Sequence, residues 1–174
     1  MIYIEKIKLI DFIQLPEDER NILEIQAKYY EREAVDCTQF KFIDVKELQL
    51  LLHEEQTYAT ILNICAKGCT LNEDLLKANW HVALTLYHSI IEAITSINEM
   101  EVNNLGGYVP SAKEISAGID VFEKYSFYNQ VRSVAIELHL HPKEVEAMEW
   151  NRVFTELCYQ KDSREFMRNL NKSE

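Results

Sequence analysis

The side chains that could bind a metal ion occur as two isolated pairs. Cys65 and Cys69 are four positions apart and could share one face of a helix, and His139 and His141 are two positions apart. Zinc sites usually combine two pairs of the Cys-x₂₋₄-Cys or His-x₃₋₅-His kind. Each pair here is half of such a motif without a second half nearby. We therefore interpret them as small buried thiols and turn histidines, and expect no metal and no other cofactor.

Local signatures of catalysis are missing from the sequence. The double glycine Gly106-Gly107 is followed by Tyr108-Val109-Pro110, so no Lys-Ser/Thr pair completes a phosphate loop. The sequence contains no Gly-x-Ser-x-Gly motif around a nucleophile. We expect a protein that is not an enzyme. The alternative is an enzyme whose site is assembled from residues far apart in the sequence.

The net charge of the chain disfavours a nucleic-acid partner. The formal net charge is −11, from 29 acidic and 18 basic residues, and a field of this sign repels a phosphate backbone. Basic residues are scattered near the end of the chain, at Lys161, Arg164, Arg168 and Lys172. We interpret them as the solvated surface of a helix, with an anionic partner as the alternative.

Length and composition indicate one cytoplasmic domain spanning 1–174. Four cysteines are too few for a disulfide framework in 174 residues. The first residues lack the pattern of a signal peptide, and no apolar run approaches the ~20 residues of a membrane-spanning helix. We therefore expect no membrane association. Within the domain, 70–174 would form the helical core and 1–45 an N-terminal α/β extension.

A long helix is the strongest structural prediction. Only four glycines and three prolines interrupt the chain, which favours a mainly α fold. Thr70 to Glu73 fits a capping box, and apolar residues then recur every three or four positions, as expected of a helix. These positions are Leu76, Trp80, Ala83, Tyr87, Ile90, Ile94 and Ile97. The pattern predicts a helix over about 72–100 at the centre of a multi-helix bundle.

The N-terminal part of the sequence predicts a short β element. Residues 37–43 alternate between polar and apolar, which favours a short strand, and 2–9 mix alternation with helical spacing. Pairing of these two segments would give a short N-terminal β element. At the other end, Asp162 to Glu165 resembles a cap for a last short helix that contains Phe166 and Leu170.

Residues 128–150 resemble a helix-turn-helix. Val134 to Val145 has the form of its core, with a turn and a new helix start at His141-Pro142. A DNA-binding regulator or antitoxin-like protein is therefore an alternative function. However, Glu144, Glu146 and Glu149 would face the phosphates, which disfavours binding.

The C-terminal third resembles a known family. Residues 138–150 have the form Leu-x-x-x-Pro-x-Glu-Val-x-x-Met-x-Trp, and Val153-Phe154-Thr155-Glu156-Leu157 follows. This is similar to the tail assembly chaperones, and related small helical assembly proteins, of tailed bacteriophages. In those, a short helix opened by Pro leads to a turn marked by Trp or Thr and then to another helix.

The resemblance implies a non-enzymatic assembly factor in the host cytoplasm. Its partner would be an aggregation-prone helical client of the tape-measure or tail-tube type. The partner-binding residues would be Val145, Met148, Trp150 and Phe154, because aromatic and Met side chains are enriched in interface cores. The alternative is that these four side chains pack the C-terminal helices together.

Overall fold

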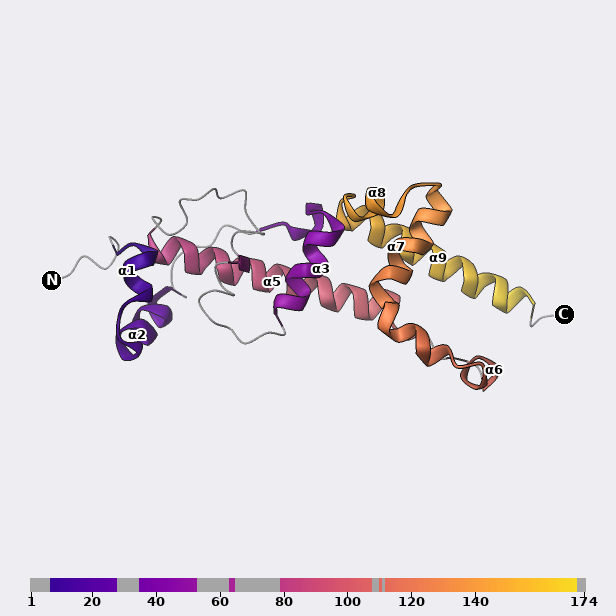
Figure 1. Cartoon of the computed structure of the whole chain (residues 1–174), viewed down its shortest axis with the longest axis horizontal. Helices are drawn as coiled ribbons and strands as arrows, with labels where there is room; N and C mark the ends of the chain where they lie inside the picture. Colours follow the sequence, from indigo (N-terminus) through magenta and orange to yellow (C-terminus); the bar gives the residue numbers. More distant parts are fainter. Residues whose placement is uncertain are drawn as a thin grey trace. The chain divides into compact units, whose positions relative to one another are not determined.

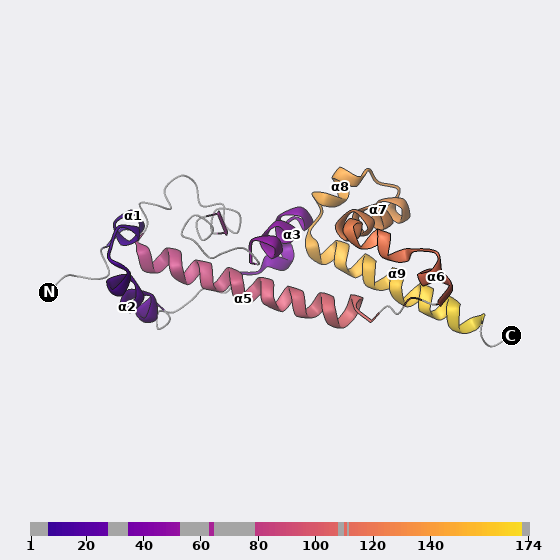
Figure 2. The same cartoon turned by 60° about the horizontal axis from the view of Figure 1, so that its bottom comes forward.

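The computed structural model describes residues 7–27, 35–52, 63–64, 79–107, 110 and 112–171. Within these ranges the chain forms α-helices and two short 3-10 helices (η), and no strand (Figures 1 and 2). The mainly α fold is confirmed. The elements are α1 (Leu9–Ile13), α2 (Glu17–Ala27), η2 (Cys37–Gln39), α3 (Phe42–Leu51), α5 (Trp80–Leu105), α6 (Ala112–Ser116), η4 (Ile119–Tyr125), α7 (Ser126–Leu138), α8 (Pro142–Glu146) and α9 (Trp150–Leu170).

The predicted long helix is α5, and its seam is confirmed. The seam residues from Trp80 to Ile97 are all buried. The predicted start at about residue 72, with the Thr70–Glu73 cap, lies outside the described residues. The helix continues past the predicted end at Met100 to Leu105, because Asn103 and Asn104 do not break it. The side chain of Asn104 donates to the carbonyl of Met100 (2.8 Å), which satisfies that amide within the helix.

The chain divides into two compact units, each of which combines distant parts of the sequence. Unit 1 contains Met1–Cys37 and Asp44–Ser96, and unit 2 contains Thr38–Ile43 and Ile97–Glu174. The boundary falls within α5, which contributes to both. The prediction of one domain over 1–174, with an extension over 1–45 and a core over 70–174, stays a prediction.

In unit 1, the first residues described pair with the start of α5. Lys8 and Asn79 form an isolated antiparallel bridge, and the backbone N–H of Trp80 donates to the carbonyl of Ile7 (3.0 Å). The Phe12 ring stacks on the Trp80 ring, with centroids 5.4 Å apart. Both rings are fully buried, so α1 is fixed to α5 by aromatic packing.

The predicted strand over 37–43 is wrong. Cys37–Gln39 is a 3-10 helix and α3 begins at Phe42, so only Lys41 pairs, in an isolated bridge with Glu149. Phe42, Val45 and Leu48 are fully buried at a spacing of three residues, and this helical pattern outweighs the short alternation before it. Residues 2–6 lie outside the described residues. The described part of the N-terminal segment pairs with Asn79 instead.

In unit 2, α7 packs on both α8 and α9. These three helices contribute the following buried apolar side chains to the core: Val131, Val134, Ala135, Val145, Trp150 and Val153. The Phe42 ring stacks on Phe127 at the start of α7, with centroids 5.7 Å apart. Thus a residue far away in the sequence completes the C-terminal core.

The predicted turn at His141-Pro142 is confirmed. His139 ends α7 in the left-handed conformation (φ 55°, ψ 40°), and the N–H of Leu140 donates to the carbonyl of Ala135 (2.9 Å). This is a Schellman-type helix end. Pro142 then opens α8. Nδ1 of His141 accepts from the N–H of Lys143, and Glu144 accepts from the N–H of His141, which forms a capping box.

Phe12→Ala should lower the free energy of unfolding by about 3–5 kcal/mol, because it leaves a cavity beside Trp80. Urea denaturation followed by circular dichroism measures this change. Ile22→Ala on the exposed face of α2 is the control, with a change within about 0.5 kcal/mol. Equal effects of the two variants would contradict the packing of α1 on α5.

His139→Gly should raise the free energy of unfolding by about 0.5–1 kcal/mol, because glycine adopts the left-handed conformation without the steric cost of a Cβ atom. His139→Ala retains the Cβ atom and should change little. Thermal unfolding of the two variants provides the comparison. A Gly variant no more stable than the Ala variant would argue against a left-handed His139.

Candidate partner-binding site

The four predicted partner-binding residues lie at the start of α9 and just before it. Val145 and Trp150 are fully buried in the core of unit 2, whereas Met148 and Phe154 are half-buried. The Trp150 and Phe154 rings stack with centroids 4.6 Å apart and an interplanar angle of 13°. In this conformation Val145 and Trp150 pack the helices together. Partner binding by the four residues stays a prediction, and Met148 and Phe154 alone have exposed surface for it.

Trp150 also joins three segments through hydrogen bonds. Its indole Nε1–H donates to Oε1 of Glu101 on α5 (2.8 Å), and its backbone N–H donates to the carbonyl of Phe40 (2.8 Å). The N–H of Phe42 in turn donates to the carbonyl of Met148 (2.8 Å). We call this group of contacts the Trp150 junction. It satisfies the one polar atom of the buried indole, which would otherwise destabilise the core.

The second half of α9 differs from the prediction. Asp162 to Glu165 do not cap a new helix, because α9 runs without interruption from Trp150 to Leu170. Ser and Asp are tolerated inside a helix when their side chains face solvent, and both are exposed here.

A row of apolar side chains occupies the outer face of this half-helix. Tyr159, Phe166 and Leu170 are spaced by seven and four residues, so they lie on one face, with Met167 beside them. Their exposed fractions are 63%, 62%, 48% and 52% (Tyr159, Phe166, Leu170, Met167). We call these four residues the α9 stripe. The sequence predicted that Phe166 and Leu170 lie in a helix, but not that they form an exposed apolar face. The spacing of seven and four residues from Tyr159 could have indicated this face.

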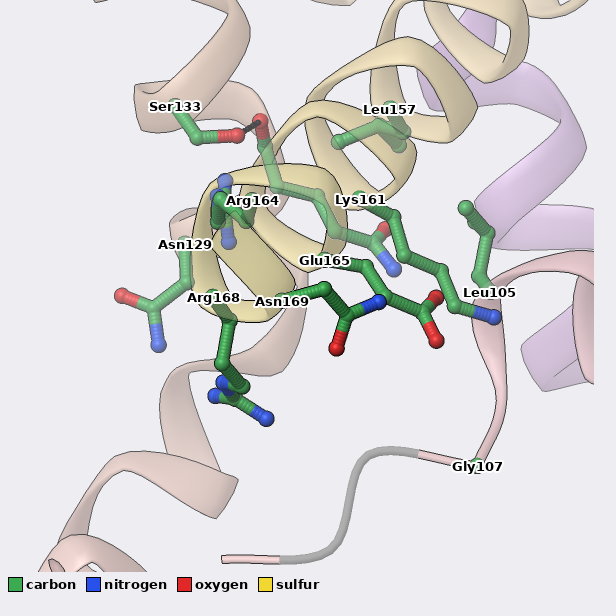
Figure 3. A pocket seen from close by; sticks show the side chains of 11 residues that line it. Leu105, Gly107, Asn129, Ser133, Leu157, Lys161, Arg164, Glu165, Arg168 and Asn169 are labelled. Atoms are coloured by element: carbon green, nitrogen blue, oxygen red, sulfur yellow. Dashed lines mark hydrogen bonds between the residues drawn. The ribbon is translucent and has the colours of Figure 1, made fainter. Parts of the chain in front are cut away.

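An open cavity of about 590 Å³ lies on the other side of the same half-helix. Figure 3 shows Lys161, Arg164 and Arg168 on α9 around it, with Lys161 extending toward Leu105. The cavity is lined from the end of α5, from α7 and from α9, all within unit 2. The lining residues are Leu105, Gly107, Asn129, Gln130, Ser133, Leu157, Lys161, Arg164, Glu165, Arg168 and Asn169.

Two of the cations have clear structural roles. Nζ of Lys161 donates to the carbonyls of Asn104 (2.7 Å) and Gly106 (2.9 Å), so it places a positive charge at the C-terminal end of α5. Arg164 donates to Oε1 of Gln160 (3.1 Å). Gln160 is buried and donates to the carbonyl of Ser133 on α7 (3.4 Å). These bonds fix the orientation of the basic face relative to α7.

The cysteines and histidines among the described residues do not form a reactive thiol or a metal cluster. Cys37 is buried, and burial together with the nearby Asp162 carboxylate raises the pKa of the Cys158 thiol, which keeps it protonated. Among the described residues, no three His, Cys, Asp or Glu side chains gather as metal ligands. Cys65 and Cys69 lie outside these residues. His139 and His141 are turn residues, as predicted.

Negative charge on α8 disfavours the helix-turn-helix alternative. The helix has five residues, and it carries Glu144 and Glu146, with Lys143 as the one basic side chain. Glu144 is further occupied as an acceptor in the capping box. A recognition helix usually presents several side chains to the major groove, and carboxylates there are repelled by the phosphates.

Comparisons with protein-family models, with curated proteins and with solved structures find no match to the chain. Every helix within the described ranges is too short or too polar to cross a membrane.

Glu101→Ala should cost about 1–3 kcal/mol of folding free energy, because the Trp150 indole N–H loses its acceptor in a buried site. The control is Glu99→Ala, an exposed glutamate on the same helix. In a Trp150→Phe background the Glu101→Ala change should cost markedly less, since no N–H remains to be satisfied. Equal costs in both backgrounds, measured by urea denaturation, would rule out this hydrogen bond as the source.

Proposed function

We propose that the chain is a non-enzymatic, protein-binding assembly factor of the tail assembly chaperone type, which binds an aggregation-prone helical client. The observation that carries this proposal is the α9 stripe. Four large apolar side chains on one helix are each about half exposed or more. Large exposed apolar side chains that share one helix face, here with Asp162 and Ser163 between Tyr159 and Phe166, typically mark an interaction site.

The arrangement of the stripe suits a helical client. Side chains at Tyr159, Phe166 and Leu170 follow the spacing with which one amphipathic helix contacts another. Phe166, Tyr159 and Met167 are residue types enriched in interface cores. A client that presents a complementary apolar face would bury these side chains and thereby be protected from aggregation.

The order of elements supports the same class. α8 begins at Pro142 and α9 at Trp150, in the order that the resemblance to tail assembly chaperones implies. The net charge of −11 would keep a complex with an apolar client soluble.

The test is co-purification of the tagged full-length chain with a client from its native source. The wild type should recover a long helical partner of the tape-measure or tail-tube type. Phe166→Ser with Leu170→Ser should reduce its recovery about tenfold or more, because interface energy concentrates in few large side chains.

Val102→Ser is the matched control, since Val102 is an exposed apolar residue on another helix of unit 2. This variant should recover as much client as the wild type. Failure of the wild-type chain to recover any such partner would refute the proposal, as would full recovery by the stripe variant.

A further inference from the structure

The two faces of α9 exchange their chemical character along the helix. In the first half, Val153 and Leu157 lie on the inner face, and Val153 is fully buried in the core. The same face continues at helical spacing through Lys161, Arg164 and Arg168, which line the cavity. Meanwhile the opposite, solvent-exposed face carries the α9 stripe, with Asp162 and Ser163 between Tyr159 and Phe166. A helix that only packed against its neighbours would show the opposite arrangement.

The basic face stands out against the charge of the whole protein. Three cations and one carboxylate, Glu165, line the cavity, whereas the chain as a whole carries −11. A cavity of about 590 Å³ is in the size range of ligand sites. Arg164 and Arg168 are exposed residues, and Arg164 donates to Gln160.

We propose that this cavity binds an acidic peptide segment of a partner protein, with Arg164 and Arg168 paired to its carboxylates. A guanidinium group presents a planar fork of donors that matches a carboxylate in two parallel hydrogen bonds. Because the chain as a whole carries a net charge of −11, an acidic segment is attracted to this basic cavity and repelled by the net charge of the rest of the chain. The inference rests on the proposed protein-binding function and names a second contact for the partner.

The remaining lining favours a peptide over a nucleic acid. Asn129, Gln130 and Asn169 carry primary amides, which both donate and accept, as does a peptide backbone. A nucleic acid offers a long row of phosphates, and its affinity depends on many Lys and Arg contacts along that row. The cavity provides three cations, one of which, Lys161, already binds the end of α5.

The experiment uses the purified full-length chain and a fluorescein-labelled oligoglutamate peptide, followed by fluorescence anisotropy at low salt. Oligoglutamine of the same length, single-stranded DNA and inorganic polyphosphate are the comparison probes. The wild type should bind oligoglutamate, and added salt should weaken the binding. Arg164→Gln with Arg168→Gln should weaken the binding of oligoglutamate about tenfold or more. When Lys instead of Gln replaces Arg168 in this double variant, less than half of the lost affinity should return.

Arg152→Gln is the matched control, because it removes one exposed positive charge from the same helix outside the cavity. Arg168→Gln alone serves as the second variant, since it leaves the bond between Arg164 and Gln160 in place. Thermal unfolding confirms that each variant is folded. Arg152→Gln should bind as the wild type does.

Equal binding of oligoglutamate by the wild type and both cavity variants would overturn the inference, as would no binding at all. Tighter binding of DNA or polyphosphate than of oligoglutamate would also overturn it, in favour of a phosphate ligand. These failures leave the proposed function standing, because client recovery through the α9 stripe is measured separately with Phe166 and Leu170.

Discussion

The structure of unit 2 depends on the burial of one indole. Trp150 is the first residue of α9, and its side chain lies in the core while its N–H groups bind Glu101 and Phe40. An indole buried without an acceptor would weaken the core, so α5 must supply the carboxylate at this place. The same junction holds the Phe40–Phe42 segment against Met148, and thereby brings a part of the N-terminal half into the C-terminal unit.

Because Trp150 fixes the start of α9, the rest of the helix can expose apolar side chains and line a cavity with basic ones. Trp150 and Val153 bury enough apolar surface to fix the first half of the helix, so the second half need not contribute to the core. Its inner face is then able to carry Arg164 and Arg168, and its outer face the α9 stripe. The proposed binding surface thus extends from a half-helix that is packed in the core, an arrangement that would hold its side chains in place.

The sequence predicted those features that local chemistry decides. The seam from Trp80 to Ile97 has a long helical period, and Pro142 sets the start of α8 through its fixed φ angle. The segment 37–43 was misjudged because seven residues are too few to separate a period of two from a helical start. Its bridge partner, Glu149, also lies about a hundred positions away. Along α9, periodicity could not reveal which face packs in the core, since Trp150, Val153 and Leu157 on one face and Tyr159, Phe166 and Leu170 on the opposite face both follow helical spacing.

The two tryptophans of the chain have a consequence for spectroscopy. Trp80 is buried in unit 1 against Phe12, and Trp150 is buried in unit 2 against Phe154. Each indole is therefore an intrinsic fluorophore for one unit, in an apolar environment that shifts its emission to shorter wavelength. A protein that keeps a single tryptophan would report the melting of that unit alone. Together the two single-tryptophan proteins would reveal whether the units, which share α5, lose their structure in one transition or in two.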